Sequence, residues 1–154
     1  MAFGLTACTF AFDPDGRVLL VQSKDRRDTW EPPGGVVEDG ESPAEAACRE
    51  AYEEARIAVR LTGCSGVYHH VAARRLCVAF LARGCGEPRP SDETPGARWF
   101  TVREADAAIT RPSLRLRWTD AIAMRETRPG GYADYATRPF SIERRMTAGG
   151  GGTG

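Results

Sequence analysis

The first part of the chain alternates between short apolar runs and turn residues. Residues 5–12 are rich in Thr, Phe and Ala, and residues 17–22 are rich in Val and Leu. The sequence DPDG at 13–16 separates them, with Pro and Gly where a tight turn needs them, so the pattern predicts a β-hairpin. The polar sequence SKDRRDT at 23–29 then predicts an exposed loop.

A helix is predicted after the stiff, glycine-containing turn WEPPGG at 30–35. Ser42 can cap it, Pro43 fits its first turn, and Glu45 completes a capping box. One face is apolar, with small residues recurring at helical spacing: Ala44, Ala47, Cys48, Ala51 and Ala55. The acids at 50, 53 and 54 share the other face, because positions i, i+3 and i+4 lie together on a helix.

The second part of the chain predicts further strands and two helices. Residues 58–62 and 66–83 read as strands, the second either long and bent or a hairpin around 72–74. Residues 84–96 hold three of the ten prolines and predict a surface loop, followed by a short strand at 97–100. Helices are predicted from 101 to about 109 and over 112–126, whereas 128–146 has no clear pattern. We expect one domain over 1–146 and a flexible glycine-rich tail at 147–154.

Composition bounds the class of protein. The 154 residues are 42% hydrophobic and 27% charged, which is ordinary for a single globular domain with its own core. Lys plus Arg and Asp plus Glu are 21 each, so the chain lacks the basic excess usual in proteins that bind polymeric nucleic acid. A small anionic substrate bridged by metal ions needs no such excess.

The cysteines and the N-terminus indicate a cytoplasmic protein. Five cysteines, without C-x-x-C spacing, predict neither a disulfide framework nor a zinc site, and they read as reduced apolar residues. No Lys or Arg precedes Arg17 and the first apolar run is broken at 13–16, so we expect a strand there and no signal peptide. No segment is long enough to span a membrane, and we expect no membrane partner.

The central motif carries the chemistry. It reads G-x5-E-x7-R-E-A-x-E-E from Gly35 to residue 54, and it clusters three carboxylates beside a glycine-rich turn. Unpaired carboxylates this close repel one another, and a divalent ion such as magnesium, which prefers oxygen ligands, removes the conflict. The alternative is a solvated helix face with Glu–Arg pairing. The Pro-Pro-Gly-Gly turn and the fixed spacing to Glu41 favour the metal site over that alternative.

The segment 35–57 resembles the signature of the Nudix hydrolases, G-x5-E-x7-R-E-U-x-E-E-x-G-U, where U is a bulky apolar residue. The lead-in WEPPGG and the sequence RWFTVRE at 98–104 resemble the family as well. The resemblance implies an α/β fold, an α/β/α sandwich around a mixed sheet. It also implies hydrolysis of a nucleoside diphosphate linked to another moiety, with Mg²⁺ or Mn²⁺ as cofactor.

The resemblance also implies roles for single residues. Glu50, Glu53 and Glu54 would be metal ligands and catalytic residues, joined by the carbonyl of Gly34. Arg49 would hold a glutamate in place, and Glu41 would support the loop–helix turn or the metal shell. Two residues depart from the signature: Arg56 replaces a glycine that tolerates a left-handed backbone, and Ala51 replaces a bulkier residue. Neither departure removes a ligand.

Several residues outside the motif have two interpretations each. Asp92 and Glu93 are candidates for a base or further ligand, or else solvated loop acids. Trp30 could stack on a base or pack beside the turn, and Arg26 and Arg27 could meet phosphate or remain solvated. The later candidates for substrate or dimer contacts also have plain structural interpretations: Tyr68, His69, His70, Arg111, Arg115, Arg117, Tyr132 and Tyr135.

The leading hypothesis is a magnesium-dependent hydrolase acting on a small nucleotide-type substrate. A nucleotide-sugar such as ADP-ribose and a nucleoside triphosphate both fit, because residues that read the base lie outside the motif. The alternative is a non-catalytic nucleotide-binding domain that regulates a partner. A homodimer is expected from the resemblance only. The sequence leaves open the nucleotide derivative, the general base, the number of metal ions and the role of 128–146.

Overall fold

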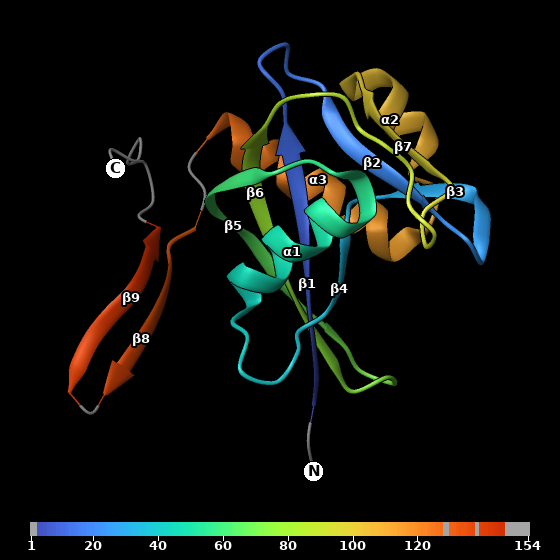
Figure 1. The fold of residues 1–154 in the computed structure, drawn as a ribbon. Helices are drawn as coiled ribbons and strands as arrows, with labels where there is room; N and C mark the ends of the chain where they lie inside the picture. Colours follow the sequence, from blue (N-terminus) through green and yellow to red (C-terminus); the bar gives the residue numbers. More distant parts are fainter. Residues whose placement is uncertain (1–2, 128–129, 138, 147–154) are drawn as a thin grey trace.

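The structure is a computed structural model that describes residues 3–127, 130–137 and 139–146 (Figure 1). The expected tail at 147–154 lies outside the described residues. The strands and helices follow in chain order: β1 (Gly4–Phe12), β2 (Val18–Ser23), β3 (Arg26–Glu31), β4 (Gly34–Val36), α1 (Pro43–Ala55), β5 (Val59–His70), β6 (Arg75–Gly84), β7 (Gly96–Phe100), α2 (Val102–Ala108), α3 (Pro112–Glu126), β8 (Tyr132–Thr137) and β9 (Phe140–Met146).

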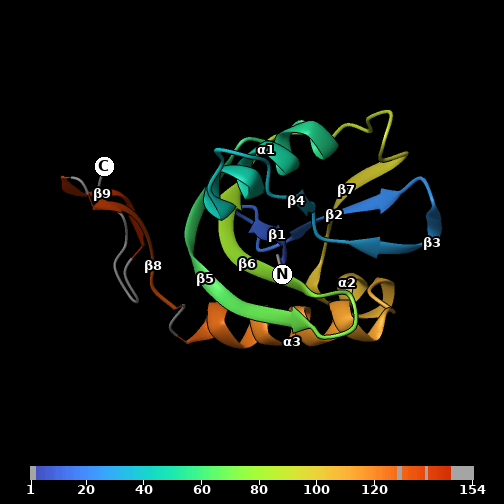
Figure 2. The same ribbon diagram turned by 90° about the horizontal axis from the view of Figure 1, so that it is seen from below.

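A mixed sheet forms the centre of the fold. Its strand order is β3-β2-β1-β6-β5, with β4 paired to β1 and β7 paired to β2. β1 and β6 run parallel, whereas the other pairs are antiparallel. α1 covers one face, and α2 and α3 cover the other (Figure 2). The structure therefore confirms the expected three-layer α/β/α arrangement around a mixed sheet.

The pleat of β1 distributes its side chains between the two helical layers. Cys8, Phe10 and Phe12 belong to the core cluster that contains Trp118 of α3. Ala7 and Ala11, whose side chains point to the other face of the sheet, belong to two clusters that contain alanines of α1. Alanines on both β1 and α1 let the helix lie close to the sheet. The polar face of α1 is thereby placed beside β4.

Two sequence-based assignments need correction, and one segment without an assignment is found to be a hairpin. Residues 24–28 are exposed, as expected, but the segment 23–29 is not only a loop because β3 begins at Arg26 and pairs with β2. β5 runs without a break from 59 to 70, since the irregularities near residues 62 and 65 are shifts in its pairing with β6. The unassigned segment forms the β8–β9 hairpin. The hairpin at 72–74 is confirmed, with a turn at 71–74.

The N-terminus of α1 forms as the sequence predicts. The Ser42 hydroxyl accepts a hydrogen bond from the Glu45 amide at 3.2 Å, and the Glu45 carboxylate accepts one from the Ser42 amide at 2.8 Å. Arg56 ends the helix in a left-handed conformation, with φ 59° and ψ 27°. This is the backbone geometry for which a glycine is favoured, and here an arginine adopts it.

Candidate active site

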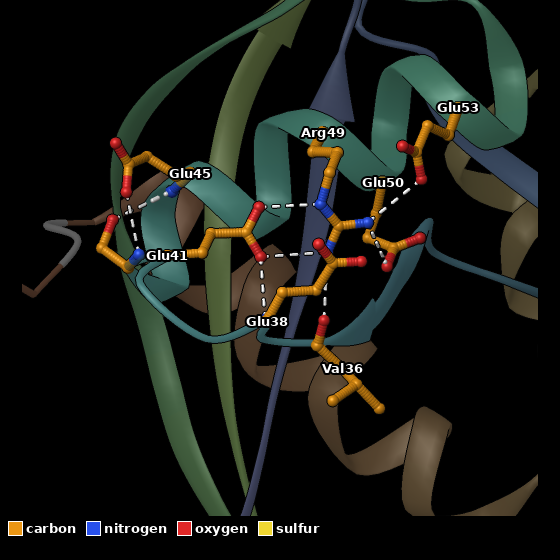
Figure 3. A network of polar contacts seen from close by, with 8 residues as sticks. Val36, Glu38, Glu41, Glu45, Arg49, Glu50 and Glu53 are labelled. Atoms are coloured by element: carbon orange, nitrogen blue, oxygen red, sulfur yellow. Dashed lines mark hydrogen bonds and ion pairs between the residues drawn. The ribbon is translucent and has the colours of Figure 1, made fainter.

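Arg49 organises the acidic side of α1 (Figure 3). Its Nε donates to Glu41 Oε1 at 2.7 Å and its Nη2 donates to Glu41 Oε2 at 3.0 Å, a bidentate pair. Nη2 also donates to the Val36 carbonyl at 3.0 Å. Nη1 donates to Glu50 Oε1 at 2.9 Å and to Glu53 Oε2 at 3.0 Å. One guanidinium thus fixes the turn before α1 and two of the three clustered acids.

The two glycines of β4 allow close packing that other residues would prevent. A Cβ at Gly35 would lie 2.3 Å from Glu50 Oε1, and a Cβ at Gly34 would lie 2.5 Å from the Ala7 carbonyl oxygen. Glu50 is consequently buried, only 8% exposed, between its own helix and the glycine turn. Burial raises the pKa of Glu50, while contact with Arg49 opposes that rise.

Glu54 is the most strongly perturbed acid of the site. Burial, and then the nearby charge of Glu50, raise its pKa to about 8, against the opposing effect of a hydrogen bond from the Gly34 amide. The charges of Glu31 and Glu93 raise it further. Its Oε2 atom is buried and has no hydrogen-bond donor within the described parts of the chain. A buried carboxylate oxygen without a donor is costly, and a cation would satisfy it.

The donor set fits a hard divalent cation. The charge of Glu93 raises the pKa of both Glu50 and Glu54, and the charge of Glu31 raises the pKa of Glu54, so four carboxylates lie close together here. Among the residues that the structure describes, no three side chains are already grouped as metal ligands. Arg49 holds Glu50 and Glu53 by hydrogen bonds, so binding of an ion would require their carboxylates to turn toward it.

The loop that carries Asp92 and Glu93 is attached to the end of α1. The Thr94 hydroxyl, buried at 3% exposure, donates to the Glu54 carbonyl at 2.5 Å, and the Arg89 amide donates to the Ala55 carbonyl at 2.9 Å. Glu93 is therefore held near Glu50 and Glu54, although Glu93 itself is exposed. Asp92 is exposed on the same loop.

The candidate residues of β3 each have different contacts. Trp30 packs edge-on against Phe100, with ring centroids 4.8 Å apart, which fits the packing interpretation, and its stacking on a base stays a prediction. Arg26 lies 3.7 Å from Glu31 Oε2. Arg27 is exposed, and its carbonyl accepts a hydrogen bond from the Gln22 side chain. Contact of Arg26 and Arg27 with phosphate stays a prediction.

The three arginines of α3 have different roles. Arg111 Nη1 lies 3.4 Å from Glu31 Oε2, which connects the start of α3 to the acidic site. Arg115 donates to the Asp106 and Ile109 carbonyls, so it supports the junction between α2 and α3. Arg117 lies over the ring of Tyr68 on the other face of the sheet from α1.

The remaining candidates have local contacts. His69 packs edge-on against Phe3, and His70 Nδ1 accepts a hydrogen bond from the Ala73 amide in the β5–β6 turn. Tyr132 packs on Phe80 with centroids 5.0 Å apart, within its own chain. The side chain of Tyr135 lies outside the described ones. All five cysteines are free in the structure.

Two residues of the site were not recognised in the sequence. Glu31 lies among the acids and bridges Arg26 and Arg111, and its position directly before the Pro-Pro-Gly-Gly turn is the signal that could have identified it. Thr94 anchors the loop to α1 through the Glu54 carbonyl. No local pattern marks Thr94, because its partner is 40 residues away.

Within the described residues, no helix combines the length and the apolar character needed to cross a membrane. Sequence comparison matches the family described as NUDIX domain to residues 2–121. A MutT-like protein of Streptomyces ambofaciens is 35% identical over 109 residues, covering 70% of each chain. Diphosphoinositol polyphosphate phosphohydrolase 2 of Rattus norvegicus is 41% identical over 61 residues, which cover 40% of this chain but only 34% of the relative.

Among solved structures, a NUDIX hydrolase from Nitrosomonas europaea superposes with a TM-score of 0.74. It is 21% identical, and the match covers 82% of this chain and 73% of that one, so this likeness concerns the fold. The family match extends over most of the chain and includes the whole acidic motif with its arginine and glycine turn. The chain therefore belongs to the Nudix hydrolase family.

Proposed function

We propose that the protein is a magnesium-dependent hydrolase that cleaves the diphosphate linkage of a nucleoside diphosphate joined to another moiety. The observation that carries the proposal is the buried Glu54 oxygen that lacks a donor and is surrounded by further carboxylates. Such a group is unfavourable in a purely structural helix and favourable where a cation binds. Nucleotide-sugars such as ADP-ribose and nucleoside triphosphates are the substrates that we consider.

Glu50, Glu53 and Glu54, with the Gly34 carbonyl, would hold Mg²⁺ or Mn²⁺. When bound, the ion would supply charge neutralisation at the diphosphate and a water molecule of lowered pKa. Arg49 keeps the carboxylates of Glu50 and Glu53 on the same side of α1. Gly35 leaves space for the Glu50 carboxylate. Glu93, exposed and close to Glu54, is our candidate for the group that accepts the proton of the attacking water.

The relatives support the reaction class. The name of the rat relative describes a phosphohydrolase of diphosphoinositol polyphosphates, and that relative is matched by this chain over a third of its length. Equal numbers of acidic and basic residues suit a small substrate whose charge is neutralised by metal ions. A cytoplasmic location, in keeping with the free cysteines, and a homodimer are also part of the proposal.

The test is release of phosphate products from a panel of nucleotide-sugars and nucleoside triphosphates, with Mg²⁺, with Mn²⁺ and with EDTA. We expect turnover with either ion and none with EDTA. Glu54→Gln should lower kcat by at least about 100-fold, because it removes a charged ligand while keeping the side-chain shape. Glu126→Gln on the exposed end of α3 is the matched control and should leave kcat unchanged.

The outcome separates a hydrolase from a regulatory binder. Nucleotide binding with no turnover of any substrate under either ion would show that the domain binds without catalysis. Turnover by Glu54→Gln at the parent rate would show that the acids of α1 do not form the site.

A further inference from the structure

A second group of polar side chains lies on the face of the sheet that α3 covers. We call it the Arg117 cluster, and it comprises Arg117 and Asp120 of α3, Tyr68 of β5, Cys8 of β1 and Cys77 of β6. The Tyr68 hydroxyl donates to Asp120 Oδ2 at 2.8 Å. The guanidinium carbon of Arg117 lies 5.6 Å from the centre of the Tyr68 ring, and the two sulfur atoms are 3.8 Å apart.

A glycine shapes this cluster. The Tyr68 ring lies back over Gly66 of the same strand, since a Cβ at Gly66 would lie 2.5 Å from the Tyr68 hydroxyl oxygen. The ring is therefore held between the strand and α3, with its hydroxyl directed at Asp120. Tyr68, Arg117 and Asp120 all remain partly exposed, so another molecule can reach them.

Among the described residues, no oxygen atom accepts a hydrogen bond from Arg117. Its Nε is buried and has no hydrogen-bond partner, and within the described parts of the chain no carboxylate forms an ion pair with it. Its close polar neighbours are sulfur atoms, which are weak acceptors. A guanidinium only donates hydrogen bonds, so the group that completes this site must present an oxygen or a ring nitrogen as acceptor.

The surroundings of Arg117 select a neutral acceptor over an anion. Asp120 supplies one negative charge three residues along α3. The neighbouring Cys8 thiol, assisted by the charge of Arg117 and opposed by burial, lowers the pKa of the Cys77 thiol, which favours negative charge on that sulfur. These charges offset the arginine, and a second phosphate would gain little there. A carbonyl oxygen on a planar ring fits better, because guanidinium groups also stack on such rings.

The cluster and the acids of α1 are connected through the β1–β4 strand pair. Cys8 pairs with Gly34 across β1 and β4, and the Gly34 amide is the group that bonds Glu54. Trp30 packs against the same hydrophobic cluster as Cys8 and Tyr68. To contact Arg117, a substrate with its diphosphate at Glu54 would have to extend its other end past this strand pair.

We propose that Arg117, positioned by Tyr68 and Asp120, recognises the nucleobase of the substrate through a ring carbonyl oxygen, so that the enzyme prefers 6-oxopurine to 6-aminopurine nucleotides. This inference rests on the proposed function for its substrate class. An amino group at position 6 would face the arginine donors with another donor, whereas an oxo group accepts from them. A bidentate arginine contact of this kind discriminates bases by about 1–3 kcal/mol, about 5- to 150-fold.

Inosine and adenosine 5′-monophosphates test the proposal because they differ only at one edge of the ring. Inosine has a 6-oxo group and a proton on N1, whereas adenosine has a 6-amino group and no proton on N1. Binding of each is measured by calorimetry in EDTA, which removes catalysis from the experiment. We expect inosine monophosphate to bind at least about tenfold more tightly. Arg117→Met should abolish the difference, and Arg103→Met, at an exposed position of α2, should keep it. Circular dichroism and thermal melts confirm folding of each variant.

Equal binding of the two nucleotides by the parent protein, or tighter binding of the adenosine form, overturns the proposal without any variant. A preference that survives in Arg117→Met overturns it as well. If Arg117→Met does not fold, Arg117→Lys keeps the charge without the planar donor pair and should reduce the preference. Hydrolysis of inosine and adenosine triphosphates with Mg²⁺ then separates the two ideas: equal kcat/KM values refute the base preference and leave the hydrolase intact.

Discussion

α1 and α3 cover opposite faces of one sheet, but they hold their charged side chains in different ways. Arg49 of α1 finds its carboxylate partners within its own segment, at Glu41, Glu50 and Glu53. Asp120 of α3 bonds Tyr68, which is 52 residues away, and Arg117 lies over the same ring. The chemistry of α1 is thus a property of one stretch of chain, whereas that of α3 exists only once the sheet has formed.

This difference predicts distinct effects of replacing the two arginines. Of the two, Arg49→Lys should have the larger effect on kcat, because lysine cannot bond Glu41 bidentately while also reaching Glu50, Glu53 and the Val36 carbonyl. We expect kcat to fall by about 10- to 100-fold for every substrate, with a smaller change in KM. Steady-state kinetics on inosine and adenosine triphosphates provide the measurement.

Arg103→Lys serves as the control for that experiment. A loss in Arg49→Lys that is confined to one of the two nucleotides would contradict the division of roles, since the proposed base preference belongs to the α3 side. An unchanged kcat in Arg49→Lys would show that Arg49 does not position the acids for catalysis.

The second prediction concerns pH and applies to the acids of α1. The pKa of Glu54 is about 8 in the folded protein, above the ordinary value of 4.5, so the folded state binds its proton more tightly than the unfolded state. Without metal, the free energy of unfolding should therefore decrease as pH rises from about 5 to 8, by roughly 2 kcal/mol after screening by solvent. Urea denaturation in EDTA at several pH values measures this slope.

Glu54→Gln should flatten the pH dependence, because glutamine does not titrate. Mg²⁺ at pH 8 should raise the stability of the parent protein more than that of Glu54→Gln, since binding to the folded state stabilises it. A slope that is the same in both proteins would assign the pH dependence to other groups.

The smallest expected effect lies at the end of α1. Arg56→Gly should stabilise the protein by about 0.5–1 kcal/mol, because it relieves the left-handed backbone, while it loses the exposed contact of Arg56 with the Tyr52 ring. Chemical denaturation measures it. Arg60→Gly in the extended backbone of β5 is the matched control and should destabilise. If both glycines destabilise equally, the conformation at 56 is not strained.

Local features were readable from the sequence. The capping box of α1 and its stripe of buried alanines depend on neighbours within a few positions. The contact of Arg49 with Glu41 follows from the motif for the same reason. The β1–β2 turn was also predictable, because Asp13 accepts hydrogen bonds from the Asp15 and Arg17 amides beside it.

Features that depend on tertiary contacts were not readable. The polar sequence of β3 predicts a loop. The segment is a strand because β2 supplies its hydrogen-bonding partner. No sequence pattern marks Thr94, because its hydrogen bond to the Glu54 carbonyl forms only in the folded chain. Tyr68 and Arg117 were ambiguous on their strand and helix, since their contact needs the packing of α3 on β5.

The attachment of the loop after β6 has a consequence for tolerance of chain-length change. Arg89 and Thr94 fasten its second half to the last turn of α1, and a hydrogen bond from Trp99 fastens its start at the Gly86 carbonyl. The short stretch between residues 86 and 89 lies outside these fastenings. Insertions there should lengthen the loop while Glu93 keeps its position. This stretch is therefore where added residues would least disturb the acidic site.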